Sequence, residues 1–204
     1  VALAIFDSTD EADPNGVVPD LYAVKATIES SLSVDWGFLE FGLGSMAISV
    51  NTGSDWAGGS IGNPVADLSQ NFAATNGFEV SDATGAAIAI DFNTDILSVE
   101  LNDVLLKVGD FIHVSGNLSY STVGDTEMTL TDKTTRTMSG QVIGASNVNV
   151  FAGSGPYFQD SNGDGTIDNT DDRVPGATGL AFEGIDIAVA LFKPTTGSSS
   201  TYTP

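Results

Sequence analysis

The sequence has no cysteine, only six lysine and arginine residues, and a single histidine among its 204 residues. Without cysteine there is no disulfide framework, no thiolate metal site and no thiol nucleophile. The 27 aspartates and glutamates give the chain a formal net charge of −21. Because such a polyanion repels nucleic acid and anionic membrane surfaces and attracts divalent cations, we expect no nucleic-acid partner.

Long apolar runs are missing as well. No segment approaches the ~18 residues that a membrane span requires, so we expect no membrane insertion. Residues 1–6 (VALAIF) lack the basic start and the length of a signal peptide, and an export signal would lie outside this segment. Hydrophobic residues still make up 41% of the chain, which is enough for a folded core.

Apolar and polar residues alternate along most of the chain, and this period of two is typical of β-strands. Clusters of Gly, Asn, Asp and Ser separate the alternating segments. A short helical turn is expected only around residues 65–73. The fold class predicted is all-β, with an antiparallel β-sandwich or a strand stack as its architecture. The strand candidates are residues 22–28, 44–51, 86–92, 95–101, 103–108, 112–120, 128–131, 140–151 and 185–191.

Two hexads far apart in the chain resemble each other. Residues 1–6 read VALAIF and residues 187–192 read IAVALF, and each hexad precedes a polar segment that ends in proline. Two short apolar strands can be alike by chance, but the similarity favours one unit of a tandem array. On this interpretation residues 1–20 are a terminal strand and linker shared with the preceding repeat, 21–192 are the β repeat domain, and 193–204 lead to the next repeat.

The segment from Asp160 to Asp171 (DSNGDGTIDNTD) fits the twelve-residue calcium-loop pattern. Glycine stands at the sixth position, where the chain turns sharply, and Ile167 at the eighth can anchor the loop. The twelfth and last position is Asp171, where helical calcium loops usually carry Glu. Because the Asp side chain is shorter than that of Glu, Asp172 is an alternative last ligand. The predicted Ca²⁺ ligands are the side chains of Asp160, Asn162, Asp164, Asp168 and Asp171 and the backbone carbonyl of Thr166.

The flanks of this loop are wrong for a helical calcium sensor. Gly153, Pro156, Pro175 and Gly176 interrupt helices on both sides. We therefore expect residues 160–172 to form a loop between strands, in which Ca²⁺ acts as a structural brace. A second acidic segment, residues 7–15, is a candidate for another ion site between repeats, but it matches no ligand spacing and a solvated linker is favoured.

Catalytic motifs are weak in this chain. Residues 58–62 (GGSIG) match a nucleophile elbow, but no helix follows and His113 is predicted on the solvent face of a strand. A sugar-binding platform of Trp36, Trp56, Tyr157 and Phe158 is an alternative. The pattern favours Trp36 in the core and Tyr157 and Phe158 beneath the calcium loop. We expect no enzyme activity.

Three segments carry a resemblance to a known class of protein: residues 21–26 (LYAVKA), residues 141–169 with their GPYFQDSNGDGTID loop, and residues 179–194. They resemble modules of very large bacterial surface proteins, which carry tandem copies of about this length with one such loop each. The loop is also similar to dockerin and thrombospondin type 3 calcium loops. The resemblance covers nearly the whole chain and implies an extracellular or cell-surface location, in adhesins or filaments, without established catalysis.

The sequence thus predicts a calcium-stabilised structural repeat unit of an extracellular bacterial filament or surface adhesin. Its partners would be neighbouring copies of the same repeat, with a glycan or surface ligand as a further candidate. The alternative is an adhesive or carbohydrate-binding module of a larger secreted protein.

Overall fold

The computed structural model describes residues 1–6, 20–53, 65–163 and 171–195, and these residues are mostly β-strand. The one short helix expected near residues 65–73 is present within them as α1. The elements are β1 (Ala2–Phe6), β2 (Leu21–Ile28), β3 (Leu32–Asp35), β4 (Leu39–Leu43), β5 (Ser45–Gly53), α1 (Leu68–Asn71), β6 (Phe78–Ser81), β7 (Ala87–Ile90), β8 (Ile96–Val108), β9 (Ile112–Thr129), β10 (Thr135–Ser154), β11 (Phe158–Gln159), β12 (Asp172–Arg173) and β13 (Thr178–Pro194).

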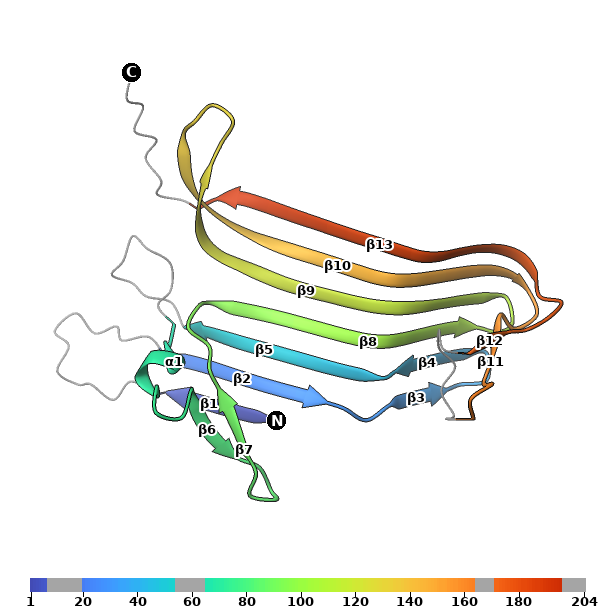
Figure 1. Ribbon diagram of the computed structural model, residues 1–204, viewed down its shortest axis with the longest axis horizontal. Helices are drawn as coiled ribbons and strands as arrows, with labels where there is room; N and C mark the ends of the chain where they lie inside the picture. The colour runs from blue at the N-terminus through green and yellow to red at the C-terminus, as the bar shows by residue number, and fades with distance from the viewer. Residues whose placement is uncertain (7–19, 54–64, 164–170, 196–204) are drawn as a thin grey trace.

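Nine of these strands form one large sheet in which paired strands run antiparallel. The strand order is β1-β2-β5-β8-β9-β10-β13, and β4 extends the sheet by pairing with β8 and with β3. Figure 1 shows the long strands side by side in a single layer, with β13 along one edge. Two further sheets, β6-β7 and β11-β12, have two strands each. The prediction of an antiparallel all-β fold is confirmed, but the described residues form one large sheet and not a sandwich.

β-Bulges explain why the segments 95–101 and 103–108, expected as separate strands, form the continuous strand β8. The register slips by one residue between Leu101 and Val104, where Asp103 has a φ of 53°. The Asp103 N–H donates to the Asn117 side chain at 2.9 Å, so the bulged residue keeps a hydrogen bond. Gly116 pairs with the next residue, Val104, and an added Cβ at Gly116 would be 2.8 Å from the Val148 Cα. The bulge therefore bends the sheet without interrupting it.

One face of the large sheet is apolar, because the pairing register aligns hydrophobic side chains across successive strands. None of these side chains is fully buried, and those on the outer strands are exposed. We call this the apolar face. Its central rows are Ile48, Val99, Tyr120, Ile143 and Val189, followed by Met46, Leu101, Leu118, Ala145 and Ile187.

The opposite face is covered at both ends, and we call it the covered face. At one end, α1 and the β6–β7 hairpin pack on Ala2, Ala4 and Ala23 and form one core cluster. At the other end, Tyr157 and Phe158 pack on Phe151 from β10. Among the described residues, the two buried clusters thus lie on the same side of the sheet, and Leu43 and Leu105 are buried outside them.

Two side chains lie where the sequence did not place them. His113 is 3% exposed, although its position was predicted to face solvent, because the aromatic residues after β10 cover it. Trp36, predicted in the core, is 66% exposed in the turn between β3 and β4. For His113 the alternation was correct, but the covered side of the sheet was assigned wrongly. Trp36 lies outside the strands, so alternation does not place it.

Candidate functional site

The two strands beside the acidic loop pair with each other. β11 and β12 align Phe158 with Arg173 and Gln159 with Asp172, and the Val174 N–H donates to the Tyr157 carbonyl at 2.9 Å. This short ladder brings the first and last positions of the predicted calcium loop to the mouth of one hairpin. The prediction of a loop between strands is therefore confirmed for its flanks.

Hydrogen bonds close the mouth of the loop. Asp171 is 7% exposed, and its Oδ1 accepts from the Ser161 N–H at 2.9 Å and from the Ser161 hydroxyl at 3.3 Å. The Asp172 N–H in turn donates to the Ser161 Oγ at 2.9 Å. The hydrogen bonds from Ser161 compensate the burial of the Asp171 carboxylate, which is the last predicted ligand.

The beginning of the loop makes a tight turn at Gly163, whereas the turn predicted at Gly165 lies outside the described residues. Asp160 Oδ1 accepts from the Gly163 N–H at 2.7 Å, and Gly163 has a φ of 76°, in the left-handed region. Asn162 lies within this turn. The carboxylates of Asp160 and Asp171 therefore flank the same hairpin mouth.

Three predicted ligands, Asp164, Thr166 and Asp168, lie outside the described residues. Within the described ranges, no three His, Asp or Glu side chains gather closely enough to hold a metal ion. The donors at the mouth are carboxylate and amide oxygens, the hard ligands that Ca²⁺ prefers, and so the residues present fit this ion. Asp160, Asn162 and Asp171 would hold it together with the three residues of the intervening segment.

An aromatic cluster anchors the hairpin on the sheet. Phe151 and Tyr157 stack with ring centroids 4.5 Å apart, and Phe158 meets Tyr157 edge-on at 4.7 Å. His113 lies 5.1 Å from the Phe158 ring, centroid to centroid. Tyr157 and Phe158 were predicted to pack beneath the calcium loop: their burial is confirmed, whereas most of that loop lies outside the described residues.

A polar link joins the hairpin to β13. The Tyr157 hydroxyl and the Arg173 guanidinium both donate to the Glu183 carboxylate, and Arg173 also lies 5.8 Å from the centroid of the Tyr157 ring. Burial, followed by the hydrogen bond to Glu183, raises the pKa of Tyr157. Sequence reasoning missed Glu183, because nothing in its local sequence indicates a partner that lies 26 residues away.

The single histidine is enclosed and kept neutral. Burial, and secondarily the charge of Lys107, lowers the pKa of His113 to about 4. Lys107 itself pairs with Glu40 at 2.6 Å. Ser60 of the GGSIG motif lies outside the described residues, so the structure provides no Ser–His arrangement that includes it.

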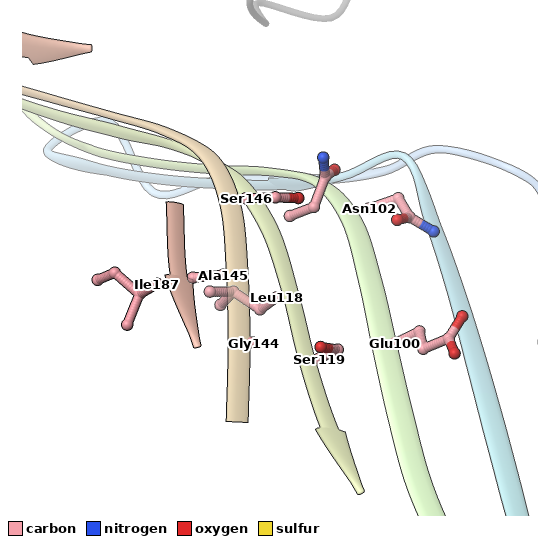
Figure 2. Close-up of a pocket in the computed structure, with 9 residues that line it drawn as sticks. Glu100, Asn102, Leu118, Ser119, Gly144, Ala145, Ser146 and Ile187 are labelled. Carbon is pink, nitrogen blue, oxygen red and sulfur yellow. The ribbon is translucent and has the colours of Figure 1, made fainter. Parts of the chain in front are cut away.

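A hollow of about 320 Å³ lies on the sheet near the bulges. Figure 2 shows Glu100 and Asn102 on one side of it and Ile187 on the other, with Ser119, Gly144 and Ser146 between them. Among the described residues, Glu100 is the one acidic side chain that lines it. Glycoside hydrolysis uses a pair of carboxylates, so this hollow does not supply that constellation.

Aromatic side chains are exposed at the turns that lie toward the β11–β12 end of the sheet. Trp36 and Phe38 project from the β3–β4 turn, each 66% exposed, and Phe111 projects from the β8–β9 turn. Gly109 brings the turns together: its N–H donates to the Phe38 carbonyl at 2.6 Å, and both phenylalanine rings lie next to it. We call Trp36, Phe38 and Phe111 the aromatic tip.

Both lateral edges of the large sheet lack a strand partner within the described part of the chain. β1 pairs only with β2, and β13 pairs only with β10. Leu3 and Ile5 on β1, and Ile187 and Leu191 on β13, are exposed. Exposed apolar edge strands are templates for pairing with another chain.

No protein-family model, no curated protein and no solved structure matches this chain. Among the described residues, no helix has the length and apolar character needed to cross a membrane.

Proposed function

We propose that this chain is a calcium-stabilised structural repeat unit of an extracellular bacterial filament or surface adhesin, and that its partners are neighbouring copies of the same repeat. The observation that carries the proposal is the large single-layer sheet, whose apolar face and two edges have no cover among the described residues. A sheet normally buries its hydrophobic face against a second layer. Neighbouring copies would supply what one copy lacks.

The amount of exposed apolar surface supports an interaction role. Phe182, Ile187 and Leu191 of β13 are each at least 50% exposed, as are Leu3 and Ile5 of β1. Contiguous apolar patches are rare on monomeric soluble proteins and mark interaction sites or aggregation liabilities. In a repeat array, such surfaces are buried by the next unit.

Calcium would brace the end of the unit. The hairpin mouth holds the buried Asp171 carboxylate, and Tyr157 and Arg173 connect this hairpin to Glu183 on β13. Binding of a dication to the loop would therefore stabilise the docking of the hairpin on the sheet. The strongly acidic composition and the resemblance to bacterial surface modules support the extracellular location.

Sedimentation of residues 1–204, over a range of protein concentrations and with Ca²⁺ or EGTA, tests the proposal. We expect concentration-dependent association in Ca²⁺, and a higher melting temperature when a second copy is joined to the first. A strictly monomeric chain whose melting temperature is indifferent to a second copy would contradict the structural-repeat function.

The aromatic tip favours a second candidate, an adhesive or carbohydrate-binding module. Exposed, adjacent aromatic side chains can stack on the apolar faces of sugar rings, and Trp36 is one of them. Titration with a panel of soluble polysaccharides, measured by isothermal titration calorimetry, tests this function, with Trp36→Ala as the variant. Binding that is lost in this variant supports it, and the absence of binding in the unmodified chain rejects it for the panel.

A further inference from the structure

The two edges of the large sheet are built from the same hexad. Residues 1–6 (VALAIF) contain β1, residues 187–192 (IAVALF) belong to β13, and the second, fourth and sixth residues are identical. Across the sheet, the register places Ala2 in the same row as Ala190, through β2, β5, β8, β9 and β10. The alanines of both hexads therefore lie on the covered face.

At the β1 edge, alanine has a clear steric role. Ala2 and Ala4 are 1% and 5% exposed because the layer that contains Leu68 and Ile90 packs directly on them. A larger side chain at either position would have to displace this layer, because packed interiors leave no spare volume. Small residues are required wherever an edge strand lies beneath α1 and the β6–β7 hairpin.

At the β13 edge, the same alanines have no such neighbour. Ala188 and Ala190 are exposed, and no described core cluster includes them. The strand carries no charge and no proline from residue 187 to residue 192, so it lacks the devices that normally prevent edge-to-edge pairing. β13 thus has alanines on the covered face and one edge without a strand partner. β1 has the same alanines, and it pairs with β2 through one edge.

We infer that β13 of one copy pairs with β2 of the following copy, in the place that β1 occupies here. This inference rests on the proposed function as a repeat unit. The register of β1 with β2 then sets the new pairing: Ala188 lies opposite Lys25 of the following copy, Ala190 opposite Ala23, and Phe192 opposite Leu21. Ala188 and Ala190 enter the core beneath α1 of that copy.

The pairing completes β2. β1 pairs with residues 21–25 of this eight-residue strand, whereas residues 185–192 of β13 reach its whole length and place Ile185 opposite Ile28. Ile28 is exposed in the single chain. The apolar face also becomes continuous, with Val189 beside Val24 and Leu191 beside Tyr22. Because β13 and β2 are different surfaces, the contact is head-to-tail, and such a contact adds copies in one direction.

A two-copy chain tests this pairing: residues 1–192 of a first copy followed directly by residues 7–204 of a second. The first copy's β13 then stands where the second copy's β1 would be. Ala190→Glu in the first copy would place a carboxylate beneath α1 of the second copy. We expect this variant to lower the melting temperature of the two-copy chain by several degrees. The matched control is Ala190→Glu in the second copy, where the side chain stays exposed and no shift is expected.

Paired cysteines test the register, and the absence of native cysteine makes the readout unambiguous. Directly opposed residues in an antiparallel pair are close enough for a disulfide, whereas diagonal ones are not. In the two-copy chain, Leu191→Cys in the first copy should therefore cross-link with Tyr22→Cys in the second. The combination of Leu191→Cys with Val24→Cys, shifted by two residues, should cross-link several-fold less.

The outcomes separate this inference from the proposed function. Selective cross-linking of positions 191 and 22, with a loss of stability only for Ala190→Glu in the first copy, supports the pairing. A second result is that the two-copy chain melts at a higher temperature than the single copy, but both cysteine pairs cross-link equally and both glutamate variants have the same melting temperature. The copies then meet by another surface, and the proposed pairing is wrong. If the second copy gains no stability either, the repeat function fails as well.

Discussion

Phe151 and Tyr157 stack nearly parallel, with ring planes 6° apart and centroids separated by 4.5 Å. Phe151 belongs to β10 and Tyr157 begins the arm that leads into the acidic loop. This contact attaches the candidate calcium hairpin to the covered face of the sheet. It links the ion-binding segment to the strands that form the edge of the molecule.

Removal of either ring should destabilise the protein. Phe151→Ala deletes a side chain that is fully enclosed in this small cluster, and loss of such a group costs about 3–5 kcal/mol. Phe111→Ala is the matched control, because Phe111 is 60% exposed and its loss should change stability by no more than ~0.5 kcal/mol. Urea denaturation followed by circular dichroism measures both. Equal midpoints for the two variants would show that the cluster does not hold the hairpin.

The Tyr157 hydroxyl should stabilise the docked hairpin through Glu183. Tyr157→Phe keeps the stacked ring but removes a hydrogen bond to a carboxylate, and we expect a loss of roughly 1.5 kcal/mol in the free energy of unfolding. Because the pKa of Tyr157 is raised in the folded state, its contribution is complete below about pH 10 and is lost as the pH rises further. Unfolding measured from pH 7 to pH 11 tests this, and a wild-type advantage that grows above pH 10 would be the wrong sign.

His113 should destabilise the fold in acid. Its pKa falls from 6.5 in the unfolded chain to about 4 in the folded protein, so the unfolded state binds the proton first. The stability contribution is present above pH 6.5 and is lost as the pH falls through about 4, by up to ~3 kcal/mol in total. Lys107, paired with Glu40, is the charged group beside this ring.

A His113→Phe variant isolates this effect from the titration of the carboxylates. The ring Nε2 has no hydrogen-bond partner among the described residues, so a phenyl ring should fit without loss of stability at pH 7. The difference in unfolding free energy between variant and wild type should grow as the pH falls from 7 to 4. A difference that stays constant would mean that His113 titrates normally in the folded protein.

Calcium removal should loosen residues 153–178 and lower the melting temperature. At a free Ca²⁺ concentration 100-fold above the dissociation constant, binding adds about 2.7 kcal/mol to stability. Asp160→Asn combined with Asp171→Asn should make the melting curve insensitive to EGTA, whereas Asp110→Asn, in the exposed β8–β9 turn, should leave the calcium response intact. An unchanged wild-type melting curve in excess EGTA contradicts the calcium brace.

Alternation in the sequence predicted most strands, because the period of two is a local property of the backbone. β9, β10 and β13 include the expected segments 112–120, 140–151 and 185–191, and β5 covers all but the first residue of 44–51. The strand expected at 128–131 is only the end of β9, which stops at Thr129, and the short helix α1 lies within its expected range. The bulge at Asp103 was not predicted, since Asn102 and Asp103 resemble a turn and only the pairing with Asn117 keeps them in one strand. Local patterns thus identified the strands but not their irregularities.

The assignment of faces could not be made from alternation alone. His113 is buried because Tyr157 and Phe158, more than 40 positions later in the sequence, return to cover it. The sequence correctly grouped Ile112, Val114, Leu118 and Tyr120 on one face, but this apolar face is the uncovered one. For the candidate site, the Gly and Pro residues beside the loop predicted a loop between strands, which β11 and β12 confirm for its flanks. The calcium ligands stay a prediction from the loop spacing, and the Tyr157–Glu183–Arg173 link depends on tertiary structure.

Hydrogen exchange by NMR at the β13 edge tests most directly whether the sheet continues from one copy into the next. In a single copy, alternate amides between residues 185 and 192 point away from β10 and should exchange rapidly. In the two-copy chain, these amides of the first copy should become protected, while those of the second copy remain fast. Rapid exchange of the outward amides in both copies would contradict a continuous sheet.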